Sequence, residues 1–152
     1  MKNTLNEIFN EARDNFNLIF RTYKILEMSY EMKISIHPAG QWILDNMYVI
    51  EQEYSVIKEE KKNLKNKRLP IIKASDGSKY ISIYYLANEL VEENKGAINQ
   101  WLIEEKLREH QKFSYLSSLE LNLFMLMLKI ALLKFIARVS ENILHSQLQK
   151  LV

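Results

Sequence analysis

The chain contains no cysteine, and its three glycines and two prolines are few for 152 residues. Without thiols it can form neither disulfide bonds nor thiolate metal sites, and it has no cysteine nucleophile. Folds with many strands and tight turns need more glycine and proline, so this composition favours an all-α protein. The lack of cysteine also fits a reducing compartment, and we expect a cytoplasmic protein.

An excess of charge of one sign is also missing. The chain has 21 Lys and Arg against 19 Asp and Glu, which gives a formal net charge of +2. Binding along nucleic-acid phosphates needs a larger basic excess. The stretch from Lys58 to Arg68 gathers basic residues, but Glu59 and Glu60 dilute the charge and no aromatic residue lies within it to stack on bases. We predict no nucleic-acid partner and a solvated helix face there, with contact to an anionic surface as the alternative.

The third absence is a long uninterrupted apolar run. The most apolar stretch, Leu121–Ile136, is broken by Asn122, Lys129 and Lys134. A membrane span needs roughly 20 apolar residues, and a lysine in its middle costs about 3 kcal/mol on insertion scales. We predict no direct membrane span and interpret this stretch as a core helix.

Apolar residues recur at three- and four-residue spacing through most of the chain, which predicts helices with one apolar face. The last helix is expected to be the longest and the most apolar. The sequence therefore predicts an all-α bundle of about five helices around a long apolar C-terminal helix, in a single domain over residues 1–152. The expected helices cover approximately residues 3–31, 38–64, 80–94, 98–113 and 118–149.

Several helix ends carry recognisable signals. Pro38 suits a first helical turn, and Gly96 is placed to cap the third helix. Ser117 with Glu120 three residues later forms a capping-box sequence that opens the last helix. Between residues 65 and 79 turn-forming residues predict an ordered connector.

Residues that carry catalysis or bind metals do not gather in the sequence. His37, His110 and His145 lie on different expected helices or at their ends, without a second ligand at a spacing that would place two on one face. The isolated glycines fit neither a phosphate-binding loop nor a nucleophile elbow. Adjacent glutamates on a helix point apart. We predict no catalytic residue, no metal site and no cofactor in this chain.

One polar residue interrupts an apolar surface. Asp45 lies between Trp42 and Tyr48, and if it were buried it would need a hydrogen-bonded or charged partner. We interpret Asp45 as structurally paired, with ligand binding as the alternative.

The same region carries a family resemblance. The chain contains the segment His37-Pro38-Ala39-Gly40-Gln41-Trp42-Ile43-Leu44-Asp45-Asn46. This segment resembles the Pro-Ala-Gly-Glu-Trp-Leu-Leu-Asp-Asn motif of cyclic β-1,2-glucan synthases, with Gln41 in place of the usual Glu. Leu69-Pro70, the segment Tyr84–Val91 and Leu119-Glu120-Leu121 resemble later parts of that region, so the resemblance covers about residues 36–140. The motif residues are His37, Pro38, Gly40, Trp42, Asp45, Asn46, Leu69, Pro70 and Glu120.

The resemblance implies a parent enzyme that transfers glucose from UDP-glucose and builds a cyclic β-1,2-glucan, using membrane-embedded glycosyltransferase and phosphorylase-like domains. This chain matches only the region ahead of the glycosyltransferase. It is therefore expected to be a non-catalytic helical scaffold that docks onto other domains of the synthase or onto a second copy of itself, at the inner face of the membrane through the parent protein. Trp42 would serve as an aromatic anchor, with Asp45 and Asn46 in a buried polar network.

Two other functions remain open at this stage. The chain fits a stand-alone helical interaction protein that binds a partner helix through apolar surface around Met125 and Met127, which would leave a large apolar patch exposed. A homodimer through the last helix is compatible with the same pattern. An enzyme acting on a glucan or a nucleotide sugar ranks last, because paired catalytic carboxylates with a supporting cleft cannot be placed.

Overall fold

The computed structural model describes residues 5–66, 78–111 and 118–152, and every regular element in these ranges is a helix. The prediction of an all-α bundle is confirmed. The predicted motif residues Leu69 and Pro70, most of the expected connector and Ser117 of the capping box lie outside the described residues. The helices are α1 (Leu5–Glu31), α2 (Pro38–Asn66), α4 (Ser78–Glu93), α5 (Gln100–Gln111) and α6 (Ser118–Leu151).

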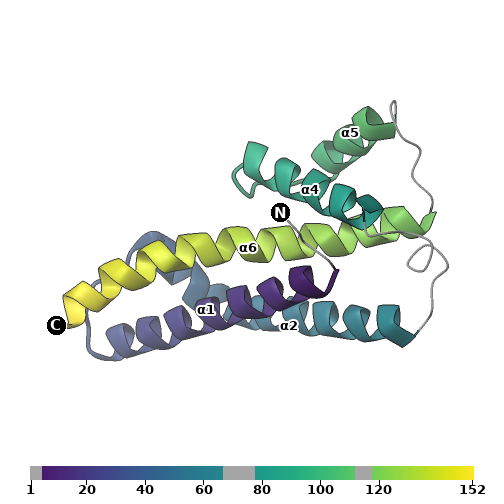
Figure 1. Cartoon of the computed structure of the whole chain (residues 1–152). Coiled ribbons are helices and arrows are strands. Elements are labelled where there is room, and N and C mark those ends of the chain that lie inside the picture. Colours follow the sequence, from purple (N-terminus) through teal and green to yellow (C-terminus); the bar gives the residue numbers. More distant parts are fainter. Residues whose placement is uncertain (1–4, 67–77, 112–117) are drawn as a thin grey trace.

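The helices form three layers, with α6 in the middle (Figure 1). On one side α6 packs against α1 and α2, and on the other side it packs against α4. Helix α5 lies on α4. The longest helix, with 34 residues, is therefore the element around which the other layers assemble.

The core is formed by the apolar faces that the spacing predicts. In α1 the buried positions include Ile8, Ala12, Ile19 and Leu26, all at 0–1% exposure and separated by four or seven residues. Helix α6 is enclosed more completely. Between positions 121 and 139 its only exposed residues are Asn122, Met125 and Arg138.

The three cations that interrupt the apolar sequence of α6 each pair with a glutamate on another helix. The distances are 2.9 Å for Lys129 and 3.4 Å for Lys134. Because all these groups are partly exposed, each pair contributes at most about 1 kcal/mol. The pairs join Lys129 to Glu53 of α2, Lys134 to Glu11 of α1, and Arg138 to Glu92 of α4. In the described ranges no helix has the length and apolar character needed to cross a membrane.

Helix α4 ends at the glycine that the sequence indicates. Gly96 has a φ of +81°, which glycine adopts without strain, and its N–H donates to the carbonyl of Val91 at 3.0 Å. Beyond this cap, α5 is held against α4 by Lys106, whose side chain is only 8% exposed and donates to Glu93 at 2.9 Å and also to Glu89. Burial acts to lower the pKa of Lys106, but the hydrogen bonds to these two carboxylates outweigh it and raise the pKa above its ordinary value.

Candidate binding groove

The segment with the family resemblance forms the first turns of α2. Helix α2 begins at Pro38, as predicted. One ring nitrogen of His37, Nδ1, accepts a hydrogen bond from the N–H of Ala39 at 3.0 Å, and so satisfies a donor of the first turn. His37 therefore belongs to the start of the helix.

Gly40 lies where α2 comes closest to its neighbours. A Cβ added at this position would stand 2.9 Å from Cδ2 of Leu26 and 3.0 Å from Cγ2 of Ile36. Both distances are shorter than ordinary van der Waals contact. The glycine therefore lets the first turn of α2 pack closely against α1 and the segment before α2.

The structure corrects the prediction for the next three motif residues. Trp42 is 49% exposed, and Asp45 lies at the surface, where it accepts a hydrogen bond from Nε2 of Gln41 at 2.9 Å. Asn46 donates to the backbone carbonyl of Trp42 at 2.8 Å. These bonds stay within α2. The prediction of a buried polar network is wrong, because Asp45 is exposed.

The reason is the register of α2. This helix buries Ile43, Met47 and Ile50, which are spaced by four and three residues. Trp42 precedes the first of them by one position, and one position turns a helix by about 100°. Trp42 therefore lies at the edge of the apolar face of α2, where it is half exposed.

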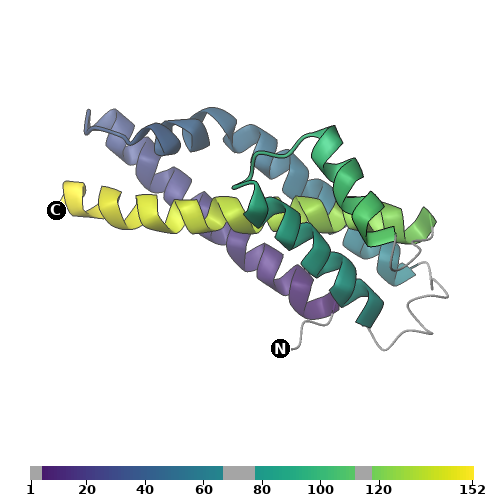
Figure 2. The same ribbon diagram turned by 90° about the horizontal axis from the view of Figure 1, so that it is seen from above.

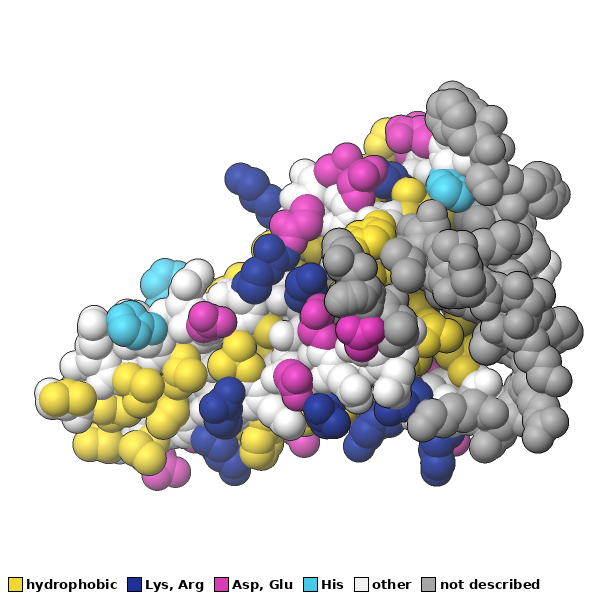
Figure 3. All heavy atoms as spheres, in the orientation of Figure 1, with side chains coloured by type: hydrophobic (Ala, Val, Ile, Leu, Met, Phe, Trp, Pro, Cys, Tyr) yellow, Lys and Arg dark blue, Asp and Glu magenta, His cyan; other side chains and the backbone are white. Residues whose placement is uncertain are grey.

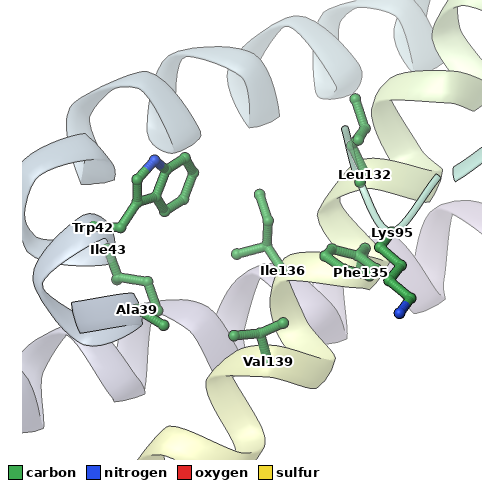
Figure 4. A pocket seen from close by; sticks show the side chains of 9 residues that line it. Ala39, Trp42, Ile43, Lys95, Leu132, Phe135, Ile136 and Val139 are labelled. Carbon is green, nitrogen blue, oxygen red and sulfur yellow. The ribbon is translucent and has the colours of Figure 1, made fainter. Parts of the chain in front are cut away.

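Beside Trp42 an apolar groove opens between α2 and α6 (Figure 4). It has a volume of about 420 Å³, within the usual 300–1,000 Å³ of ligand sites. Of the described residues that line it, only Lys95 is charged. We call this hollow the Trp42 groove. It is lined by Ala39, Trp42 and Ile43 of α2, Leu132, Phe135, Ile136 and Val139 of α6, and Lys95 and Gly96 between α4 and α5.

The groove exists because α4, which covers one side of α6, is shorter than α6. At about 1.5 Å per residue, the 16 residues of α4 cover less than half the length of the 34-residue α6. The layer ends at Gly96, where an added Cβ would lie 2.9 Å from the ring of Phe135. Seen from above, the α4–α5 loop stands between α2 and α6, and α6 continues beyond it without a cover (Figure 2). Residues 132–139 of α6 are left to form the floor of the groove.

Other residues singled out in the sequence do not come together. Within the described ranges, no three His, Asp or Glu residues are grouped closely enough to hold a metal ion. Met127 is fully buried, whereas Met125 is 45% exposed, so these two do not share an interaction surface. Glu120 lies in the first turn of α6.

The sequence interpretation missed the α6 side of the groove. Phe135, Ile136 and Val139 read as core residues, because their spacing does not reveal that α4 stops short of them. The signal that was available is the position of Trp42, one residue out of register with the buried positions of its helix.

A comparison of the chain with models of known protein families, with curated proteins and with solved structures finds no match. The likeness to cyclic β-1,2-glucan synthases therefore depends on the motif residues alone. Within that motif, Ala39, Trp42 and Ile43 form the α2 wall of the groove.

Proposed function

We propose that this chain is a non-catalytic helical scaffold domain that binds a partner protein through the Trp42 groove. The observation that carries the proposal is a half-exposed tryptophan beside uncovered apolar residues of α6. Tryptophan is enriched among the residues that contribute most to protein interfaces, and an apolar hollow gives such a residue a partner surface to complete.

The occupant that fits this place is an apolar helix. Helix α4 already covers the first part of α6, and a helix from a partner would continue that layer over residues 132–139. Ridge-and-groove packing against α2 and α6 would then bury both Trp42 and Ile136. Lys95, at the end of the groove, would favour an acidic residue near the end of the incoming helix.

The resemblance allows a more specific proposal. The parent would be a cyclic β-1,2-glucan synthase-like protein that uses UDP-glucose, and the partner helix in the Trp42 groove would come from its glycosyltransferase region. The domain would then work in the cytoplasm, at the inner face of the membrane. The support for this form is that the segment resembling the family motif is the one that forms the α2 wall.

The second candidate is a stand-alone interaction module that binds a copy of itself or another protein. It is favoured by a different surface, at the end of the molecule where α1 and α6 end and hydrophobic side chains gather (Figure 3). Met28, Tyr30 and Met32 there are 49%, 68% and 57% exposed. Light scattering separates the two candidates, because only the second predicts a dimer that forms without the glycosyltransferase region.

Replacing Trp42 with alanine is expected to weaken binding of a purified glycosyltransferase region at least tenfold, or about 1.4 kcal/mol. Because Trp42 is half exposed, we expect the free energy of unfolding to fall by less than about 1 kcal/mol. Titration calorimetry gives the affinity, and urea denaturation gives the stability.

Trp101 provides the matched control, since it is the other tryptophan of the chain, is 65% exposed and lies on α5 away from the groove. Its replacement with alanine should leave the affinity within twofold of the original value. Equal losses in the two variants would contradict the groove as the binding surface.

A further inference from the structure

A second hollow, independent of the Trp42 groove, lies between α1 and α2. It has a volume of about 350 Å³. Among the described residues that line it, each charged side chain is a cation, although the whole chain carries a formal net charge of only +2. We call it the basic groove. It is lined by Phe9, Asn10 and Arg13 of α1 and by Tyr54, Ile57, Lys58, Lys61 and Lys62 of α2.

Helix geometry places the three lysines of the groove on one side of α2. Lys58, Lys61 and Lys62 are spaced by three and four positions, so they share one face of α2. Glu59 and Glu60 are not among the described residues that line the groove, although Glu59 lies three positions before Lys62 and reduces the net charge at that end of the face. Dark-blue side chains gather along the lower edge of the molecule, over α1 and α2 (Figure 3).

The lysines of the basic groove are also unpaired. Among the described residues no carboxylate lies within ion-pair distance of Lys58, Lys61 or Lys62, in contrast to the three paired cations of α6. Glu11 of α1 and Glu53 of α2 form their ion pairs with lysines of α6. Among the described residues, the three lysines of the groove thus lack a carboxylate partner, whereas Arg13 has one in Asp14.

The floor of the groove is aromatic and ordered by packing. The Nζ atom of Lys58 lies 5.2 Å from the ring centroid of Tyr54, and that of Lys61 lies 5.8 Å from the ring centroid of Phe9. The Tyr54 ring stacks on Phe16 of α1, with centroids 4.3 Å apart. These contacts place the ammonium groups of both lysines over aromatic rings.

Arg13 completes the rim from the α1 side. It forms an ion pair with its neighbour Asp14 at 3.2 Å, and both side chains are more than half exposed. Such a pair is worth at most about 1 kcal/mol and is readily exchanged for another anion. An incoming ligand would therefore meet four cations from two helices.

We propose that the basic groove binds a small, soluble polyanion that carries phosphate groups. The four cations supply the charge complementarity, and the volume matches a small ligand. A flat anionic membrane would meet the rim of the hollow without filling it, and the chain as a whole lacks the basic excess for binding along a nucleic acid. The site is separate from the Trp42 groove, so a failure of the proposed function would not contradict it.

The test is titration of the whole chain with inorganic pyrophosphate at about 50 mM salt, where exposed charges are weakly screened. We expect saturable one-to-one binding with a dissociation constant below about 1 mM. The double variant Lys58→Gln/Lys62→Gln removes two exposed cations and leaves the half-buried Lys61 in place. It should weaken binding at least tenfold while the helical circular dichroism spectrum stays unchanged.

The control Arg21→Gln/Lys33→Gln makes the same change of net charge at two exposed positions outside the groove. Its affinity for pyrophosphate should stay within twofold of the original value. Equal weakening in both double variants would overturn the proposal, as would the absence of saturation at millimolar pyrophosphate. Lysine-dependent binding to vesicles with 30% phosphatidylglycerol, without pyrophosphate binding, would overturn it in favour of a membrane surface.

Discussion

Replacing Phe124 with alanine is expected to lower the free energy of unfolding by about 3–5 kcal/mol. Phe124 lies in α6 with 0% exposure and is the largest fully buried side chain among the described residues. Because α6 packs against α1, α2 and α4, a cavity beside α6 weakens the packing that holds these helices together. Since domains of this size are stable by only about 5–15 kcal/mol, the variant should be close to unfolding.

The neighbouring position supplies the control for this prediction. Met125 lies one residue further along α6 and is 45% exposed, so its replacement with alanine should change the free energy of unfolding by less than about 1 kcal/mol. Urea denaturation followed by circular dichroism measures both variants. Similar losses at the two positions would contradict the register of α6 described above.

The second large effect is a loss of stability in alkali, caused mainly by Tyr84. Its side chain is only 2% exposed, and its hydroxyl donates to Oε1 of Glu11 at 3.0 Å. Burial raises the pKa of Tyr84 to about 12, and the negative charge of Glu11 and the hydrogen bond to it add to the rise. In the unfolded chain a tyrosine titrates near its ordinary value, 10.0.

Because the folded protein holds this proton more tightly, the contribution of Tyr84 is complete below pH 10 and is lost as the pH rises towards 12. The loss amounts to about 3 kcal/mol over this range. The raised pKa of Lys106 acts in the same direction. Urea denaturation at pH 8, 9, 10 and 11 should therefore show a steep fall in stability.

A Tyr84→Phe variant identifies the source of this fall. It should be less stable than the original at pH 8, by about 1 kcal/mol for the lost hydrogen bond, and should have a flatter dependence on pH above 9. Tyr30→Phe is the control, because Tyr30 is 68% exposed and should leave the dependence unchanged. An equally steep fall in the Tyr84→Phe variant would show that Tyr84 is not its cause.

Most of the helical architecture could be predicted from local patterns. The start of α2 at Pro38 and the cap of α4 at Gly96 depend on the backbone preferences of proline and glycine, which need no tertiary information. The burial of Ile8, Ala12 and Ile19 follows from spacing alone. Local rules of this kind are sufficient when a single helix face meets a single partner.

The two grooves could not be predicted in the same way, because each depends on how far helices extend past one another. Phe135 and Val139 line a groove only because α4 ends at the level of Gly96. Likewise, Lys61 meets an aromatic ring from α1, 52 positions earlier in the chain, so the stretch 58–68 viewed alone lacks aromatic residues. The buried network expected at Asp45 does not form, because the buried positions of α2 are Ile43, Met47 and Ile50, and Asp45 is two positions from the nearest of them.

The central claim is that the Trp42 groove is a docking surface, and the absence of cysteine permits a direct test. A Val139→Cys variant places a single thiol in the groove, and a Tyr48→Cys variant places one at a 71% exposed position outside it. The measurement is the rate at which each thiol reacts with a maleimide, with and without a saturating glycosyltransferase region, and at low and high concentration of the chain itself.

The account predicts that the glycosyltransferase region slows labelling of the Val139→Cys variant at least tenfold and leaves the Tyr48→Cys variant unchanged, and that a higher concentration of the chain alone changes neither rate. A glycosyltransferase region that binds the chain, as shown by light scattering, yet leaves the Val139→Cys rate unchanged would contradict it.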